Sequence, residues 1–148
     1  MNALSPRGLA LIQEFEGCRL DAYRDQRGVL SIGTGHTGAD VTEGLQWSQA
    51  DADAALMRDT SFAANAIIRL VDVALDQNEF DALVCLTYNI GVGAFRGSTL
   101  LRELNSANFS AASAEFPKWD RVNGEPNLGL ARRRAAEQAL FLSPPTAS

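Results

Sequence analysis

The amino-acid sequence predicts a mainly α-helical protein of the α+β class, with a small β-hairpin lobe and a larger helical lobe joined by a long helix. Apolar residues recur at helical spacing in several segments that begin with capping residues. In contrast, residues 20–37 are rich in strand-forming residues on either side of a turn. The chain has 148 residues, the length of one domain. We therefore expect a single domain over residues 1–148, with the β-containing lobe at about 16–47 and the helical lobe at about 71–142.

The chain begins with a predicted helix. Ser5 and Pro6 are typical of an N-cap and of the first helical position. Apolar residues then recur at helical spacing until Gly17 ends the pattern. Glu16 therefore falls in the last turn of this helix, at the edge of whatever the helix packs against.

A small β-hairpin is predicted next. Four residues favour strands, namely Tyr23, Val29, Leu30 and Ile32, and residues 25–28, Asp-Gln-Arg-Gly, are typical of a turn between them. The hairpin places Asp25 on or near its turn and Ser31 on its second strand. Because so small a hairpin is marginal in isolation, it must lean on neighbouring helices.

The remaining sequence predicts helices. Residues 48–51 are typical of a capping box, and an apolar stripe continues to about Leu70, which indicates one long helix linking the lobes. Residues 76–79 form a second capping pattern, and Gly91 and Gly93 end the helix that follows. The rest of the chain predicts a short helix over 98–104, another over 110–119 that Pro117 interrupts, a loop over 123–127 and a final helix over 130–142.

The charge of the chain is unevenly distributed. The net charge is −5, and residues 1–76 carry six arginines against eleven acidic residues, whereas residues 77–148 are neutral. Nucleic-acid binding requires a basic face, so this balance argues against a nucleic acid as partner. No apolar run approaches the ~20 residues that span a bilayer.

The two cysteines predict no cross-link. Cys18 and Cys85 give neither a disulfide framework nor the ligand spacing of a zinc site, and we expect both to be reduced and packed. A redox-regulatory role for Cys18, two residues after Glu16, remains the alternative. The sequence implies no metal and no cofactor.

The segment from Glu16 to His36 carries the chemistry. Glu16 lies nine positions before Asp25, and Asp25 lies six positions before Ser31. Two carboxylates and a hydroxyl on a turn-rich segment suit the cleavage of a glycosidic bond, because one acid protonates the leaving oxygen and one carboxylate holds water or supports the developing cation. In an inverting reaction Asp25 would help activate water, and in a retaining one it would be the nucleophile.

This segment resembles the catalytic signature of the phage-type lysozymes, the endolysins that cut bacterial cell-wall glycan. Glu16, Asp25 and the run from Ile32 to His36 match the family's pattern, whereas Ser31 stands where the family usually has Thr. The resemblance continues downstream in three ordered motifs, at residues 77–83, 88–95 and 132–137. It therefore spans nearly the whole chain.

The resemblance implies a role for each of the three polar groups. Glu16 would be the general acid, and apolar surroundings would favour its protonated form. Asp25 would be the second carboxylate of an inverting reaction. The hydroxyl of Ser31 would position the attacking water, although serine lacks the methyl that restricts the rotamers of threonine, so we expect retained but slower hydrolysis.

The resemblance also implies a set of substrate-binding positions. Tyr88 would stack on a sugar ring and Asn89 would contact an N-acetyl group, with Gly35 and Thr37 across the cleft and Ser98 beyond. The matching His36, the single histidine of the chain, would brace the cleft loop through an acidic partner. Tyr88 could equally be a core residue. The three arginines at 132–134 point to different helix faces, so one of them pairs with Glu16 or Glu137, or all are solvated.

The implied activity is hydrolysis of the β-1,4 bond between N-acetylmuramic acid and N-acetylglucosamine in bacterial peptidoglycan, causing lysis of the host cell. The first residues have no basic start followed by a long apolar block, so we expect no cleaved signal peptide. We expect a monomer that stays in the host cytoplasm until a separate pore-forming partner releases it to the cell wall in the periplasm. Family members are often basic, so the acidic balance of this chain affects the strength and salt dependence of wall binding.

Two other functions remain open from the sequence. A lytic transglycosylase uses one acid and produces an anhydro-sugar without water, and the presence of Asp25 argues against it. A non-catalytic wall-binding domain would retain the fold without the chemistry, and the presence of both Glu16 and Asp25 argues against that. The sequence offers no Gly-x-Ser-x-Gly elbow for an acyl-transfer nucleophile.

Overall fold

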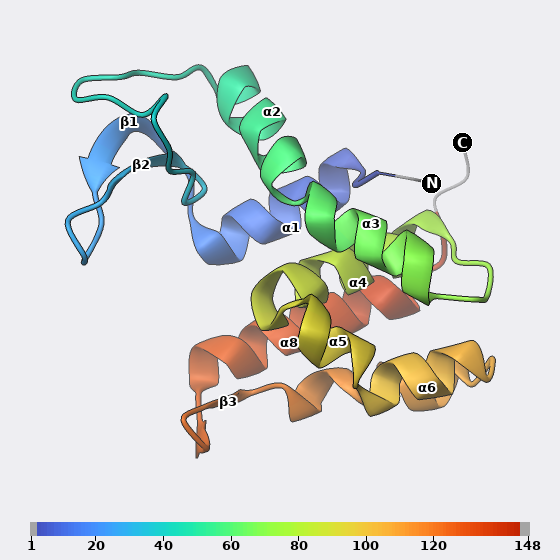
Figure 1. Ribbon diagram of the computed structural model, residues 1–148. Coiled ribbons are helices and arrows are strands. Elements are labelled where there is room, and N and C mark those ends of the chain that lie inside the picture. The colour runs from blue at the N-terminus through green and yellow to red at the C-terminus, as the bar shows by residue number, and fades with distance from the viewer. Residues whose placement is uncertain (1–2, 146–148) are drawn as a thin grey trace.

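The computed structural model describes residues 3–145 and confirms the mainly helical fold with small antiparallel sheets (Figure 1). In chain order, its elements are α1 (Pro6–Glu16), β1 (Arg19–Arg24), β2 (Leu30–Gly33), α2 (Gln49–Asp59), α3 (Ser61–Leu70), α4 (Gln77–Ile90), α5 (Val92–Arg96), α6 (Thr99–Asn105), α7 (Phe109–Ser113), the 3-10 helix η1 (Phe116–Lys118), β3 (Arg121–Val122), β4 (Glu125–Pro126) and α8 (Leu128–Leu142).

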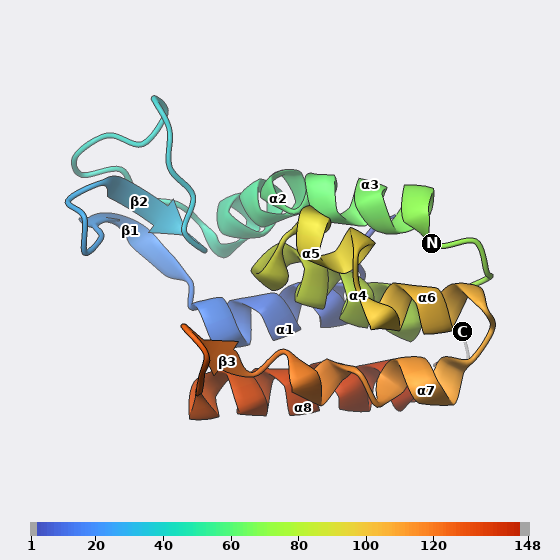
Figure 2. The same ribbon diagram turned by 60° about the horizontal axis from the view of Figure 1, so that its bottom comes forward.

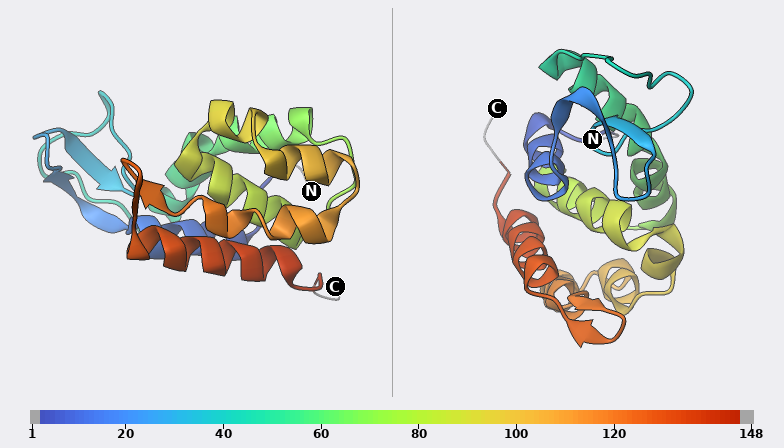
Figure 3. Two further views of the ribbon diagram at one scale, coloured as in Figure 1. Left: turned by 90° about the horizontal axis from the view of Figure 1, so that it is seen from below. Right: turned by 90° about the vertical axis from the view of Figure 1, so that its left-hand side faces the viewer.

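The predicted first helix and hairpin are confirmed. The hydroxyl of Ser5 accepts a hydrogen bond from the N–H of Gly8, and α1 ends at Gly17, whose φ of +84° suits glycine. Strand β1 pairs antiparallel with β2, with Tyr23 opposite Ser31. The hairpin extends beyond one end of the helices, on the side where β3 also lies (Figures 2 and 3). Glu16 therefore stands where the helical body meets the hairpin.

The single long helix predicted over residues 48–70 is wrong, because α2 ends at Asp59 and α3 begins after Thr60. The buried hydroxyl of Thr60 donates a hydrogen bond to the carbonyl of Leu56, 2.8 Å away. Threonine side chains that bond back to the preceding turn bend helices. The apolar stripe continues across this break, so its periodicity gave no sign of it. The capping box that begins at Ser48 is confirmed.

Helix α4 forms the centre of the core and packs against α1, α3 and α8. It begins at Asp76, whose carboxylate accepts from the N–H of Glu79 while the Glu79 carboxylate accepts from the N–H of Asp76, as the capping box predicted. Every residue from 80 to 87 is buried. Buried apolar residues contribute on the order of 1.5–3 kcal/mol each, so this helix fixes the position of the others.

The short elements after α4 differ from the prediction. Gly91 ends α4, but Gly93 lies inside the additional helix α5. The helix predicted over 110–119 is divided into α7 and η1, and α8 begins two residues earlier than predicted. The predicted loop over 123–127 forms the turn and second strand of the hairpin β3–β4, and its turn residues Asn123 and Gly124 both have positive φ. Asn-Gly is a strong two-residue hairpin signal, and it was available in the sequence.

Candidate active site

The structure places the three predicted catalytic residues on one continuous segment. Glu16 is the last residue of α1, Asp25 directly follows β1, and Ser31 lies in β2. Because α1 leads into the hairpin through only two residues, the position of the hairpin is tied to the end of the helix that carries Glu16. Their roles in catalysis remain predictions, and the surroundings of each residue show what it can do.

Glu16 is held by an arginine from the far end of the chain. Its side chain is 32% exposed, and its Oε2 accepts a hydrogen bond from Nη1 of Arg133, 2.8 Å away. The Arg133 side chain, by contrast, is only 5% exposed. The apolar surroundings expected for Glu16 are therefore wrong: a cation on α8 orients the carboxylate. Of the pairings left open for the three arginines, Arg133 contacts both Glu16 and Glu137.

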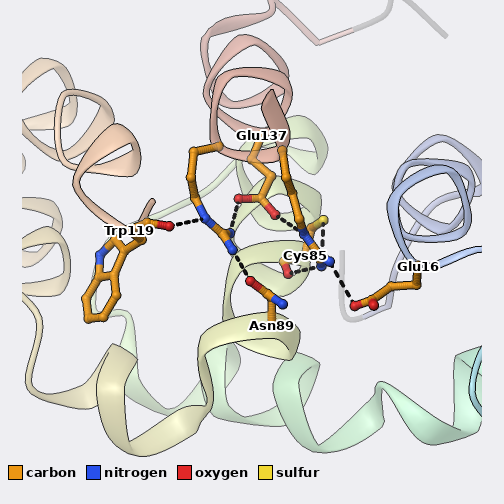
Figure 4. A network of polar contacts seen from close by, with 7 residues as sticks. Glu16, Cys85, Asn89, Trp119 and Glu137 are labelled. Carbon is orange, nitrogen blue, oxygen red and sulfur yellow. Dashed lines mark hydrogen bonds and ion pairs between the residues drawn. The ribbon is translucent and has the colours of Figure 1, made fainter. Parts of the chain in front are cut away.

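Arg133 belongs to a buried network of charged groups (Figure 4). Its Nε donates to Oε2 of Glu137 at 3.0 Å, and its Nη2 donates to the carbonyl of Cys85 at 3.1 Å. Nη1 of Arg134 donates to the other oxygen of Glu137, while Nε of Arg134 donates to the carbonyl of Trp119 at 2.9 Å. Arg134 and Glu137 are both fully buried. Two guanidinium groups thus share one carboxylate, which fixes both of them.

Cys85 lies against this network as a thiol. Burial, together with the negative charge of Glu137, raises the pKa of the Cys85 thiol well above its usual value. Both Cys85 and Cys18 are free cysteines, as predicted, but only Cys85 is buried, whereas Cys18 is partly exposed. Cys85 therefore contributes packing and a carbonyl to the site, with no thiolate chemistry at ordinary pH.

Asp25 is held by its own turn. Its Oδ1 accepts hydrogen bonds from the N–H of Arg27 at 2.8 Å and of Val29 at 2.9 Å. The Val29 N–H, opposed by partial desolvation and supported by the N–H and charge of Arg27, lowers the pKa of Asp25. Asp25 is thus a turn residue, and the turn also keeps its carboxylate ionised.

Ser31 is buried, with 2% of its surface exposed. Its Oγ donates to the carbonyl of Val29 over 3.2 Å, a long and therefore weak hydrogen bond. The hydroxyl is consequently held in a strand next to the turn of Asp25 without being tightly committed to a partner.

His36 joins the loop after β2 to helix α2. Its Nδ1 lies 2.7 Å from Oδ2 of Asp59 and its Nε2 lies 2.9 Å from Oδ2 of Asp40, and the ring packs 5.4 Å from that of Trp47. Burial works to lower the pKa of His36, but the hydrogen bonds and charges of the two aspartates outweigh it and raise this pKa. The acidic partners expected for this histidine are therefore present.

The predicted substrate-binding positions differ in their surroundings. Gly35 and Thr37, on either side of His36, are exposed. Tyr88 is half-buried near the end of α4, with its ring 6.1 Å from that of Phe62. Burial raises the pKa of Tyr88, and the negative charge of Glu16 adds to this effect. Tyr88 is therefore both a partner of the core and a neighbour of the candidate acid.

Asn89 and Ser98 contact other parts of the chain. Asn89 is exposed, and its Oδ1 accepts a hydrogen bond from Arg134. The hydroxyl of Ser98 is buried, donates to the carbonyl of Phe95 at 2.7 Å and accepts from the N–H of Leu101 at 3.1 Å. Ser98 thus caps α6, and its part in substrate binding stays a prediction.

A cavity of about 540 Å³ opens beside Asn89. Trp119, Arg121 and Leu130 are among the residues that line it, together with Arg134. Sequence reasoning missed Trp119 and did not assign Glu137 a place in the site. The run Arg-Arg-Arg-Ala-Ala-Glu was a signal for Glu137, because residues three and four apart on a helix are neighbours.

Comparisons with known proteins identify the family and agree with the fold. The family described as Phage lysozyme matches residues 13–137. The endolysin of Salmonella phage P22 is 42% identical over 97% of this chain and 100% of its own length, and that of Bacillus phage PZA is 41% identical over 95% of this chain and 55% of its own length. The crystal structure of the P22 lysozyme mutant L86M superposes with a TM-score of 0.90, at 41% identity over 97% of this chain and 100% of that one. The muramidase domain of SpmX from Asticaccaulis excentricus gives a TM-score of 0.82, at 39% identity over 95% of this chain and 98% of that one. The chain belongs to the phage lysozyme family.

Proposed function

We propose that this protein is a lysozyme that hydrolyses the β-1,4 bond between N-acetylmuramic acid and N-acetylglucosamine in bacterial peptidoglycan. The observation that carries the proposal is that its two candidate catalytic carboxylates have different hydrogen-bond partners. Asp25 is stabilised as an anion by backbone N–H groups, whereas Glu16 is oriented by Arg133, a cation balanced by Glu137. Two carboxylates with different surroundings suit the two different roles in glycoside cleavage.

The geometry favours one assignment of these roles. Asp25 remains ionised, so it suits the support of water or of a developing positive charge and is a poor proton donor. Glu16 is left as the general acid, and Arg133 keeps its carboxylate aimed in one direction. Ser31, in the strand that follows the Asp25 turn, would orient the attacking water. The family's inverting outcome is the one we propose.

Asn89 has a defined orientation for binding sugar. Because arginine has no acceptor, the hydrogen bond from Arg134 fixes Oδ1 of Asn89 toward the network and leaves the amide NH₂ as the outward group. An amide NH₂ can donate to the carbonyl oxygen of an N-acetyl group. We propose that Tyr88 contributes stacking beside it, with Gly35 and Thr37 opposite.

The test is a digest of purified peptidoglycan with products identified by mass spectrometry. Reducing muropeptides are expected from the native chain, and Glu16→Gln should lose activity by ~10²–10⁴-fold while remaining folded by circular dichroism. Wild-type rates from Glu16→Gln would overturn the assignment. Anhydro products, one water lighter, would indicate a transglycosylase. Binding to glycan without any soluble product from either protein would indicate a wall-binding domain.

Release to the cell wall is a separate proposal. The endolysin names of the relatives support action on a bacterial wall from within the host. We propose a monomer that is held in the host cytoplasm until a separate protein forms pores in the inner membrane. Among residues 3–145, no helix is long and apolar enough to span a bilayer. Expression in a bacterium should leave the culture turbid until an inner-membrane permeabiliser is added, and lysis without it would contradict this release route.

A further inference from the structure

Glu137 occupies an unusual position for a carboxylate outside the candidate catalytic pair. It is fully buried in α8, and each of its oxygens accepts from a different guanidinium group, Arg133 on one side and Arg134 on the other. The same two guanidinium groups also donate outward, Arg133 to Glu16 and Arg134 to Asn89 (Figure 4). A candidate acid and a candidate sugar-binding amide are therefore held through one buried carboxylate.

This arrangement answers a difficulty in the proposed chemistry. A general acid must hold a proton, yet the positively charged guanidinium of Arg133 lies 2.8 Å from the Glu16 carboxylate. Glu137 accepts from Nε of the same guanidinium at 3.0 Å, and its negative charge opposes the positive charge of Arg133. We propose that Glu137 is a positioning residue that offsets the positive charge of Arg133 at Glu16, so that Arg133 can orient the acid. This inference rests on the proposed function of Glu16.

Three other titratable groups lie close to this network in the described part of the chain: Tyr88, Cys85 and Asp59. Tyr88 faces it from α4, and burial raises the pKa of the phenol, so Tyr88 is neutral at ordinary pH. Cys85, also on α4, lies against Arg133 and Glu137 as a neutral thiol. Asp59, from α2, contributes to the field at Tyr88 and is paired with His36. The charges that reach Glu16 through the network are therefore those of Arg133, Glu137 and Arg134.

The network is electrically neutral, since Glu16 and Glu137 balance Arg133 and Arg134. Glu137→Gln leaves it with one excess positive charge, which stabilises the Glu16 carboxylate. Arg134→Met leaves one excess negative charge, which stabilises protonated Glu16. The double variant restores neutrality. The two single variants must therefore shift the titration of the acid in opposite directions, which simple loss of packing would not do.

The experiment is the pH dependence of kcat/KM for wall hydrolysis by the native chain, Glu137→Gln, Arg134→Met and the double variant. The basic limb of the pH profile reports the loss of the proton from the general acid. In Glu137→Gln this limb should move to lower pH by on the order of one unit, as expected when one negative charge within ~8 Å is removed at an effective dielectric near 20. In Arg134→Met it should move to higher pH, and in the double variant it should lie near that of the native chain. The acid limb, which reports Asp25, should stay in place.

Glu125→Gln on the exposed strand β4 makes the same change in net charge and should leave both limbs unmoved. Folded variants whose basic limbs coincide with that of the native chain would overturn the inference and leave Glu137 with a structural role alone. If Glu137→Gln does not fold, Arg134→Met still tests the sign, because its basic limb must move to higher pH.

A second readout separates this inference from the proposed function. Carbon NMR of the labelled Glu16 carboxyl follows its titration directly in Glu137→Gln and in the native chain, without substrate. A shift in that titration with no wall hydrolysis by the native chain would support the role of Glu137 and refute the lysozyme activity. An active native chain with an unshifted titration would do the reverse.

Discussion

Replacing Asp59 by Asn should weaken the contact between α2 and the loop after β2, and the resulting loss of thermal stability should depend on pH. Asp59 lies 2.7 Å from Nδ1 of His36, whose side chain is 15% exposed, and Asp59 itself is 33% exposed. A hydrogen bond to a charged partner contributes about 1.5–3 kcal/mol, and partial exposure places this one near the lower end. For a domain of this size, 1 kcal/mol corresponds to about 2–4 °C, so Asp59→Asn should lower the thermal midpoint by about 3–6 °C where His36 is protonated.

The direction of the pH dependence follows from the raised pKa of His36. Protonation of this histidine is favoured in the folded state, so its contribution is fully present below the unfolded value of 6.5. The contribution is lost as pH rises through the raised pKa of the folded state. Asp59→Asn should therefore cost most near about pH 5 and much less near about pH 9, where a neutral imidazole retains only an ordinary hydrogen bond.

The assay is thermal denaturation of the native chain and of Asp59→Asn in matched buffers at both pH values. Asp40→Asn is the matched control, because Asp40 contacts the other ring nitrogen at 2.9 Å but is 60% exposed. Exposed ion pairs are screened by solvent, so this control should lower the thermal midpoint clearly less than Asp59→Asn does. An equal loss in Asp59→Asn at low and high pH would refute the reasoning, since it would show that the charge of His36 plays no part.

Three further predictions follow from the site and the core. Because the N–H of Val29 leads the effects that lower the pKa of Asp25, the acid limb of wall hydrolysis should lie below the ordinary aspartate value of 3.8, and an acid limb above that value would contradict its role as the ionised partner. Ser31→Ala should reduce kcat in a turbidity assay but shift the thermal midpoint by less than about 2 °C, because its 3.2 Å hydrogen bond contributes about 0.5 kcal/mol; an unchanged rate would mean that Asp25 alone positions the water. Asp76→Ala removes the cap of α4 and should cost about 1–2 kcal/mol in chemical denaturation with wall hydrolysis preserved, whereas an unchanged midpoint would show that Glu79 caps the helix without it.

Local signals account for most of the fold that the sequence predicted. Ser5, Ser48 and Asp76 each accept from a backbone N–H at the start of a helix, and the chemistry that makes them caps involves only neighbouring residues. The break at Thr60 was missed because its cause is one side-chain hydrogen bond within an unbroken apolar stripe. The β3–β4 hairpin was missed for a different reason: its Asn123-Gly124 turn was interpreted as a loop although it has the residues of a tight turn.

The two candidate catalytic carboxylates show why one half of the site was easier to predict than the other. The partners of Asp25 are N–H groups two and four residues along the chain, so the turn that the sequence indicated already contains the groups that lower its pKa. The partner of Glu16 is Arg133, 117 positions away, and no periodicity specifies which of three consecutive arginines faces it. That choice depends on how α8 packs against α4 and on Glu137, which draws Arg133 and Arg134 to its two oxygens. A residue with no predicted contact to substrate therefore decides how the acid is held, and its replacement should alter the pH at which the enzyme works before it alters the shape of the site.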